Sequence, residues 1–570
     1  MEKLWERLEN ILDKKNNSFE NNELNNIRKE IYNFCKINSP YNKGFFELSA
    51  PTGGGKTLSS FRFAVGHAKK HGLDRIIYVI PFLNIIEQNA IVIKELLALN
   101  GLKEELVLES HSDGINEKFD TNDLNIVDDE NITTYYNNWD EPIVFTTMVQ
   151  FLENVYAGGT NAIRRFHNMA NAVIIFDEIQ ALPSKCVHMF NLLVKFLVNF
   201  ANCSVVLCSA TQPPLSNLQN KIMNLPMAKK IVTKSYPTLK RTNIINKIDI
   251  KNGTTLEEIA QNAINLAKEK NNCLIIVNTK ASVTKLFNLM KNCGIFIYCL
   301  TTNLCAQHRL KKIKEIKKKL CENKKIICIS TNLIEAGVDI DFACVIRFIA
   351  GIDNIVQSAG RCNREGKLKD ENGNKILGEV FLYYNKEENI DKLKELKDSQ
   401  TFLIDLISNR EIDFSSEDII QKYYKYKFMQ ENYKLNYPIE NNTNQFELLS
   451  QNEKLVNYAQ LKNKNISIGP IVASFDISAQ HFKVIDNNQI SVIVPYGYGK
   501  TIIKNLKENK LDYLKKAQRF TVNIFVNKIN DLFNSNAIEN LEHGILVLKE
   551  GFYDKNLGVI AEFKNQNLIY

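Results

Sequence analysis

Three successive glycines, Gly53, Gly54 and Gly55, followed by Lys56 and Thr57, restrict the fold of this chain more than any other feature. Apolar residues precede the glycines and a helix-compatible run follows them, so the stretch predicts a strand, a tight loop and a helix. Glycines let backbone N–H groups turn inward around an anion, and a helix start adds partial positive charge. In this pattern the lysine reaches the β- and γ-phosphates of a nucleotide and the threonine hydroxyl holds Mg²⁺. The stretch therefore predicts a phosphate-binding loop.

Ala50 occupies the position where such loops usually carry their first glycine, which is a small-for-small change. The alternative interpretation is a glycine-rich turn that happens to precede a lysine and a threonine. The apolar residues Phe45, Phe46 and Leu48 before the loop, together with the helical run after it, favour the phosphate-binding loop.

Short apolar runs that alternate with helical stretches extend well beyond this loop. Strands alternating with helices predict the α/β class, here two tandem doubly wound parallel sheets. The expected domains are residues 1–235, residues 236–400, and a small α+β C-terminal accessory domain at residues 401–570, where the alternation ends. The predicted strands lie at residues 75–80, 142–147, 172–178, 204–211, 273–277, 295–300, 325–330 and 343–346 of the two sheets, with a further one at 490–494.

Composition sets the broad class of the protein. The 570 residues are 44% hydrophobic and 24% charged, and the formal net charge of +8 permits nucleic-acid binding without requiring it. The 12 cysteines form no Cys-x-x-Cys pair, which favours reduced cysteines of a cytosolic core over disulfides or a zinc site. No run of 18 apolar residues occurs, and the charged N-terminus lacks the apolar stretch of a signal peptide. We expect a soluble cytoplasmic protein with no membrane partner.

Two carboxylates follow the apolar run that ends at Phe176. Asp177 and Glu178 are thus predicted at the carboxyl end of a buried strand, where ligands bind in open α/β sheets. Opposite Thr57, Asp177 can hold the Mg²⁺ that accompanies ATP, and Glu178 can orient and deprotonate the attacking water. An acid pair that merely begins a loop is the alternative.

Two arginines in the second half of the chain can supply the cations that phosphoryl transfer needs. Arg361 and Arg364 are three residues apart, which in a helix places them on one face. Ordinary surface charge is the alternative, but the second α/β domain has no phosphate-binding loop of its own. We therefore expect ATP in the cleft between the domains, with Lys56 and Asp177 on one wall and the arginines on the other.

Taken in order, these motifs resemble those of superfamily 2 helicases, whose two core domains are RecA-like. The segments that carry this resemblance are 50–57, Asp177-Glu-Ile-Gln180, Ser209-Ala-Thr211, 330–339 and Gln357-Ser-Ala-Gly-Arg361-Cys-Asn-Arg364. Further segments look like the helicase of type I CRISPR systems; these are residues 80–88, 138–147, 164–167, 177–183, 517–523 and 553–558.

The resemblance implies roles for further residues. Gly337 and Asp339 fall where the family binds nucleotide, Gln357 falls with the catalytic arginines, and Gln180, Ser209 and Thr211 fall where the family couples its domains. Gln180 replaces the acid or histidine of better-known classes, but an amide can still donate and accept hydrogen bonds. Five hydroxyl and amide residues fall where single-stranded DNA crosses both domains; these are Thr146, Thr147, Asn278, Thr279 and Thr331.

The resemblance also predicts an activity. We expect an ATP-dependent single-stranded DNA translocase or helicase that moves 3′ to 5′ in CRISPR interference, recruited by a DNA-bound surveillance complex. Many family members begin with a metal-dependent HD nuclease domain, whereas only about 20 residues precede the matching region here and no His-Asp dipeptide occurs. A separate chain or domain is therefore expected to cut the DNA. The rivals are another superfamily 2 motor, such as an RNA helicase or restriction translocase, and a nucleotide-binding scaffold without turnover.

Overall fold

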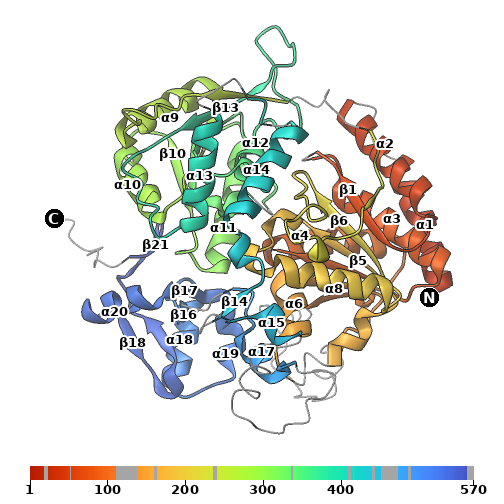
Figure 1. Cartoon of the computed structure of the whole chain (residues 1–570). Coiled ribbons are helices and arrows are strands. Elements are labelled where there is room, and N and C mark those ends of the chain that lie inside the picture. Colours follow the sequence, from red (N-terminus) through yellow and green to blue (C-terminus); the bar gives the residue numbers. More distant parts are fainter. Residues whose placement is uncertain are drawn as a thin grey trace. The chain divides into compact units, whose positions relative to one another are not determined.

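The computed structural model divides into two units by the contacts of its residues (Figure 1). One unit comprises Met1–Leu239 with Ser415–Ile485, and the other comprises Lys240–Phe414 with Asp486–Tyr570. Residues 401–570, expected as one accessory domain, thus contribute to both units. The residues that the structure describes are 1–17, 23–51, 53–81, 83–110, 138–159, 164–234, 241–335, 338–407, 412–414, 416–439, 443–450, 473–485 and 489–560.

A parallel sheet forms the centre of the first unit. Its strand order is β3-β4-β2-β5-β6-β1-β7, and every neighbouring pair is parallel. Every residue of β4, β5 and β6 is buried, as expected of strands that helices cover on both faces. The strands are β1 (Phe45–Ser49), β2 (Arg75–Ile80), β3 (Val107–Ser110), β4 (Ile143–Thr147), β5 (Ala172–Asp177), β6 (Ser204–Ser209) and β7 (Lys229–Lys230).

Helices from the N-terminal end and from the later segment Ser415–Ile485 complete the first unit. Arg62 of α3 is buried and forms ion pairs with Glu9 and Asp13 of α1, which joins the N-terminal helix to the helix that follows β1. The later segment also contacts the core, since Val484 donates its N–H to Glu153. These helices are α1 (Glu2–Asn17), α2 (Glu23–Asn38), α3 (Lys56–His71), α4 (Leu83–Ala98), α6 (Met148–Tyr156), α8 (Val187–Asn199), α14 (Glu417–Gln430), α15 (Gln445–Leu448) and α17 (Phe475–His481).

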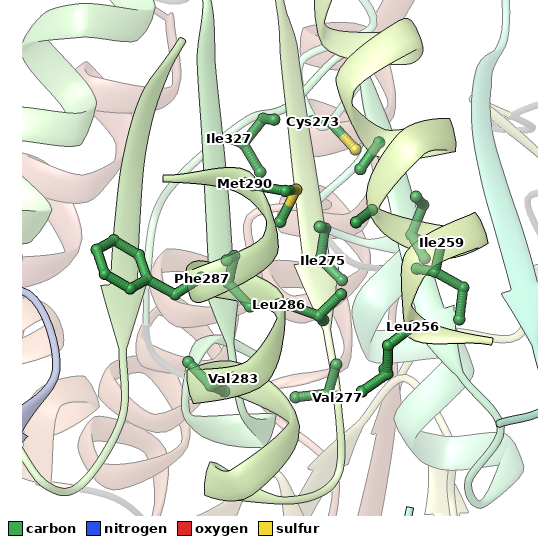
Figure 2. Packing of buried hydrophobic residues seen from close by; sticks show 14 of the residues in the cluster. Leu256, Ile259, Cys273, Ile275, Val277, Val283, Leu286, Phe287, Met290 and Ile327 are labelled. Atoms are coloured by element: carbon green, nitrogen blue, oxygen red, sulfur yellow. The ribbon is translucent and has the colours of Figure 1, made fainter. Parts of the chain in front are cut away.

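A second parallel sheet, of order β10-β11-β9-β12-β13-β8, forms the centre of the second unit. Helices α9 (Leu256–Lys270), α10 (Lys280–Met290), α11 (Ala306–Cys321), α12 (Ile352–Ala359) and α13 (Lys394–Ile407) accompany it. Figure 2 shows Ile259 of α9 and Leu286 of α10 packed beside Ile275 of β9 in one buried apolar cluster. The strands are β8 (Thr242–Asn246), β9 (Asn272–Ile276), β10 (Phe296–Leu300), β11 (Ile326–Ser330), β12 (Cys344–Phe348) and β13 (Gly378–Tyr383).

A smaller mixed sheet and a hairpin follow in the second unit. The sheet has the order β17-β16-β19-β18 and contains both parallel and antiparallel pairs. The hairpin between β20 (Tyr553–Asp554) and β21 (Gly558–Val559) buries Leu557 in the core of the large sheet. The remaining elements are β16 (Gln489–Ile493), β17 (Thr521–Phe525), β18 (Ile538–Asn540), β19 (Leu546–Leu548), α18 (Gly499–Lys507), α19 (Tyr513–Ala517) and α20 (Val526–Asn534).

The predicted α/β class with two parallel sheets and a C-terminal accessory region is confirmed. Each of the nine predicted strands overlaps a strand of the structure, whereas β3, β7, β8 and β13 of the two large sheets were not predicted. Within the described ranges, none of the helices combines the length and the apolar character that a bilayer-crossing helix requires.

Candidate active site

The predicted phosphate-binding loop joins β1 to α3. Gly53 and Gly55 adopt the left-handed conformation, with φ of 75° and 76°, which residues with a Cβ rarely adopt. A Cβ on Gly54 would lie 2.9 Å from the carbonyl oxygen of Pro51, so the backbone passes too closely for a side chain. Helix α3 begins at Lys56 without a side-chain cap, and the first N–H groups of a helix have no intrahelical partner. The loop and helix start can therefore bind an anion, as phosphate-binding loops do.

Asp177 and Glu178 lie at the same edge of the sheet as this loop. Asp177 is the last residue of β5, and only β6 separates β5 from β1, so the carboxyl ends of these parallel strands converge. The Nζ of Lys56 forms an ion pair with the Oε1 of Glu178 at 3.1 Å. The structure thus brings together the lysine and the acids that the sequence assigns to one site.

Burial and neighbouring charge shift the pKa values of this group. Burial, with the nearby Glu178 carboxylate, raises the pKa of Asp177 to about 6. Burial acts to lower the pKa of Lys56, but the carboxylates of Glu178 and Asp177 outweigh it, and the pKa is raised. At pH 7 Lys56 is therefore a cation and Asp177 is mostly ionised, which suits them to phosphate and metal binding respectively.

A chain of hydrogen bonds runs from Glu178 toward the end of β6. Gln180 donates from Nε2 to Glu178, and Ser209 donates from Oγ to the Oε1 of Gln180 at 2.6 Å. The Thr211 N–H donates to the Ser209 hydroxyl at 2.8 Å. Glu178 has a φ of 50°, an uncommon value for a residue with a side chain, and such strain concentrates at functional sites. The amide of Gln180 both donates and accepts here, as the sequence led us to expect.

Asn89 of α4 belongs to this site and was not found from the sequence. The Thr57 hydroxyl donates to its Oδ1 at 3.1 Å, and the Asn89 side chain acts to lower the pKa of the nearby Asp177 carboxyl. The hydroxyl and the carboxylate supply oxygen ligands of the kind that Mg²⁺ prefers, so these residues fit that ion. In the described part of the chain, this site included, no group of three or more His, Cys, Asp and Glu could hold a metal.

The two arginines are not on one helical face, so that prediction is wrong. Helix α12 ends at Ala359, and both arginines follow it. Asn363, with a φ of 46°, departs from helical geometry between them, and Cys362 forms an isolated bridge with Phe342. The i, i+3 spacing therefore falls in a loop.

Their side chains also have different surroundings. Arg361 is buried and donates to the carbonyl oxygens of Ile334, at 3.0 Å, and Glu335, at 2.6 Å. Arg364 is 23% exposed and forms an ion pair with Asp339 at 3.0 Å. Arg364 is thus the more accessible cation, held by a partner that is 61% exposed.

Three other residues of this segment were also predicted to belong to the site. Gln357 lies half-buried in the last turn of α12, and Asp339 lies beside Arg364. Gly337 lies outside the described residues. Its predicted role in nucleotide binding stays a prediction.

In the first unit, the two threonines expected to contact DNA lie at the carboxyl end of β4. Thr146 is buried, and its hydroxyl hydrogen-bonds the side-chain amide of Gln150 at 2.8 Å. Thr147 caps α6, because its hydroxyl accepts the Gln150 N–H at 3.0 Å. These bonds explain the residue types structurally, and the DNA role stays a prediction.

In the second unit, Asn278 and Thr279 follow β9 and are bound by the carboxylate of Glu388. Glu388 accepts from the N–H of Asn278 at 2.9 Å, from its Nδ2 at 2.8 Å and from the N–H of Thr279 at 3.0 Å. Ser282 donates its hydroxyl to the same carboxylate at 2.9 Å. A carboxylate therefore occupies donors of the kind that bind a phosphate. Thr331 is buried at the N-cap position of the short helix after β11, where its side chain makes no capping hydrogen bond.

Comparison with known proteins agrees with these motifs. The family model "CRISPR-associated nuclease/helicase Cas3, C-terminal" matches residues 269–367, and the model "DEAD/DEAH box helicase" matches residues 36–220. A CRISPR-associated nuclease/helicase Cas3 from Methanothermobacter thermautotrophicus is 24% identical over 389 residues, which are 65% of this chain and 44% of the relative. These matches support a Cas3-type superfamily 2 helicase.

Solved structures share the fold of this chain. The crystal structure of T. fusca Cas3 with AMPPNP has a TM-score of 0.63 at 15% identity, covering 95% of this chain and 70% of that one. A chain of a CRISPR RNA-guided surveillance complex, pre-nicking, has a TM-score of 0.55 at 13% identity with the same coverage. The chain spans less than half the length of the curated relatives it matches.

Proposed function

We propose that this chain is an ATP-dependent single-stranded DNA translocase or helicase, moving 3′ to 5′, that acts in type I CRISPR interference. The single observation that carries the proposal is the linked set of Lys56, Glu178, Gln180 and Ser209, because its hydrogen bonds connect a phosphate-binding loop to a neighbouring strand end. The Cas3 and helicase family matches support the same function. The resemblance supplies the direction of movement.

The ion pair between Lys56 and Glu178 suggests how the first unit changes when ATP binds. The phosphates of ATP attract the Lys56 ammonium, which then leaves Glu178. The released carboxylate can accept the proton of the attacking water as general base. Mg²⁺, held by Thr57 and Asp177, would neutralise charge on the phosphates. Gln180 stays bonded to Glu178 and Ser209, so we propose that it conveys the state of Glu178 to the end of β6.

Arg361 and Arg364 are proposed to stabilise the charge that develops on the γ-phosphate. Gln357, Gly337 and Asp339 are proposed to assist them, and the five predicted hydroxyl and amide residues to grip the DNA backbone without reading bases. The similarity to a chain of a CRISPR surveillance complex supports recruitment by such a complex. A nuclease that cuts the DNA is proposed to come from another chain or domain.

ATP hydrolysis measured with Mg²⁺ and either single-stranded DNA or RNA tests the proposal. We expect single-stranded DNA to stimulate turnover, and Glu178→Gln to lower the stimulated rate by about 10³-fold, because the amide cannot accept the water proton. The matched control is Glu95→Gln, which neutralises an exposed carboxylate on α4. Stimulation by RNA alone would favour an RNA helicase. A wild-type rate no higher than that of Glu178→Gln would favour a scaffold without turnover.

The source of nuclease activity has its own experiment. The purified chain is incubated with ATP, single-stranded DNA and Mg²⁺, Mn²⁺ or Ni²⁺. We expect intact DNA in each case, whereas metal-dependent cutting by this chain alone contradicts the proposed division of labour.

A further inference from the structure

Asn89 lies where three elements of the first unit meet. It projects from α4 toward Thr57 in the first turn of α3 and Asp177 at the end of β5. Its Oδ1 accepts the Thr57 hydroxyl proton at 3.1 Å, and its side chain acts to lower the pKa of the nearby Asp177 carboxyl. Asn89 therefore lies beside the residues proposed to hold Mg²⁺ and bonds one of them directly.

The bond between Thr57 and Asn89 has a defined polarity. A hydroxyl binds a metal through an oxygen lone pair, so its proton needs an acceptor elsewhere. The Asn89 carbonyl oxygen is that acceptor for Thr57. A carboxylate at position 89 could also accept this proton but would repel Asp177, and an aliphatic side chain would leave the hydroxyl without this acceptor.

A purely structural role for Asn89 explains these contacts less well. The start of α3 is already fixed without it, because the hydroxyls of Ser60 and Tyr78 donate to the Thr57 carbonyl oxygen at 3.1 Å and 3.3 Å. Those bonds hold the backbone of Thr57. Asn89 is the partner of its side-chain hydroxyl, the group that matters for the metal.

We propose that Asn89 is a positioning residue for the Mg²⁺ that accompanies the nucleotide, by directing the lone pairs of the Thr57 hydroxyl toward the ion. The inference rests on the proposed function, since it assigns the metal to this nucleotide site. Outer partners of metal ligands typically change metal affinity by 10- to 100-fold when they are removed. They do so without touching the metal.

Binding of fluorescently labelled ADP, titrated with Mg²⁺, tests the inference on the full chain. Asn89→Leu has about the size of asparagine but neither hydrogen-bonding group, and Asn89→Ala is the second variant in case the leucine disturbs folding. We expect both to raise the Mg²⁺ concentration for half-maximal effect by about tenfold, with metal-free ADP affinity unchanged within about twofold. The control, Asn100→Ala, removes a hydrogen bond to the Leu96 carbonyl near the other end of α4 and should leave the titration unchanged.

Two results would overturn the inference. One is an unchanged Mg²⁺ titration in both variants. The other is an equal loss of metal-free ADP binding, because a misplaced helix rather than a misdirected ligand would then explain the defect. ADP binding separates this test from that of the proposed function: a chain that binds Mg²⁺ and ADP normally but never hydrolyses ATP contradicts only the latter. A wild-type chain that binds no ADP with Mg²⁺ contradicts both.

Discussion

The two large sheets share one strand order but differ in the segments to which their strands lead. Numbered in chain order within each unit, the first six strands of the first sheet and the six of the second are both arranged 3-4-2-5-6-1. The first strand of one unit, β1, leads into the glycine loop and Lys56. Its counterpart β8 leads to α9, which begins with a capping box of Thr255 and Glu258. The shared topology would allow a nucleotide site after the first strand of both units. Only the first unit has the glycine loop at that position.

Carboxylates at the strand ends differ in the same way. In the first unit Glu178 pairs with Lys56, a cation that a phosphate can compete for. In the second unit Glu335 pairs with Arg347 at 2.8 Å, and both side chains are almost fully buried. Glu388 instead occupies backbone donors after β9. In the first unit, a phosphate can therefore replace Glu178 as the partner of Lys56. In the second unit, Glu335 and Glu388 instead hold loop segments in place.

The largest expected effect concerns Arg364, the cation that the second unit is proposed to contribute. Arg364→Ala should lower the maximal ATPase rate by about 10³-fold, the range typical of arginine fingers, while changing ATP affinity much less. Rates and nucleotide binding are measured on the same preparation. Lys367→Ala, which removes an exposed cation nearby, is the control. Equal losses of turnover and binding would show that Arg364 only helps to bind ATP, and the two units would differ less than proposed.

Asp177→Asn should lower activity and raise stability. Because burial raises the pKa of Asp177 from 3.8 to about 6, the folded state binds a proton more tightly than the unfolded state does. The ionised side chain therefore destabilises the fold, fully above pH 6 and progressively less down to pH 4. We expect the variant to be more stable by about 2 kcal/mol at pH 7, with no gain below pH 4. Denaturant unfolding at both pH values measures this.

The control for that experiment is Asp531→Asn, an exposed acid in the second unit with no comparable burial. If the free energy of unfolding of Asp177→Asn at pH 7 equals that of the wild type, burial of the ionised carboxylate does not destabilise the fold. The first unit would then be no more strained at its site than the second. Turnover should be lost in Asp177→Asn whatever its stability, since the amide is a poorer ligand for Mg²⁺.

The smallest expected effect tests the second unit. If Asn278 and Thr279 bind a DNA phosphate, Glu388 must first leave their donors, so Glu388→Gln should tighten single-stranded DNA binding by about tenfold. Fluorescence anisotropy at several salt concentrations measures it. Glu387→Gln neutralises the exposed neighbouring carboxylate and controls for general charge. Unchanged or weaker binding would mean that Glu388 is needed to shape the loop, and that these donors are structural.

The parts of the fold that the sequence predicts are those whose signal is local. Buried strands such as β5 and β6 are continuous apolar runs, and each was found. Strands β8, of which no residue is fully buried, and β7, with two exposed residues, carry no such run and were missed. The i, i+3 arginines misled because spacing alone cannot show that α12 ends before them.

In the candidate site, too, the residues predicted from the sequence are those with a local sequence signal. The glycine loop and the acid pair are contiguous motifs with known chemistry, and the sequence locates them. Asn89 is 32 residues from Thr57, and Glu388 is 110 residues from Asn278, so only the folded chain reveals those pairs. A lone polar residue on a helix or in a loop looks the same in the sequence whether it faces a ligand or water.

The order in which the chain builds its two units has a mechanical consequence. Because the first unit takes back residues Ser415–Ile485 and the second takes back Asp486–Tyr570, the backbone passes from one unit to the other three times. A protease that cuts any one of these passages leaves a fragment that still holds pieces of both units, kept in place by packing. Any force that separates the units therefore acts on three covalent connections rather than one.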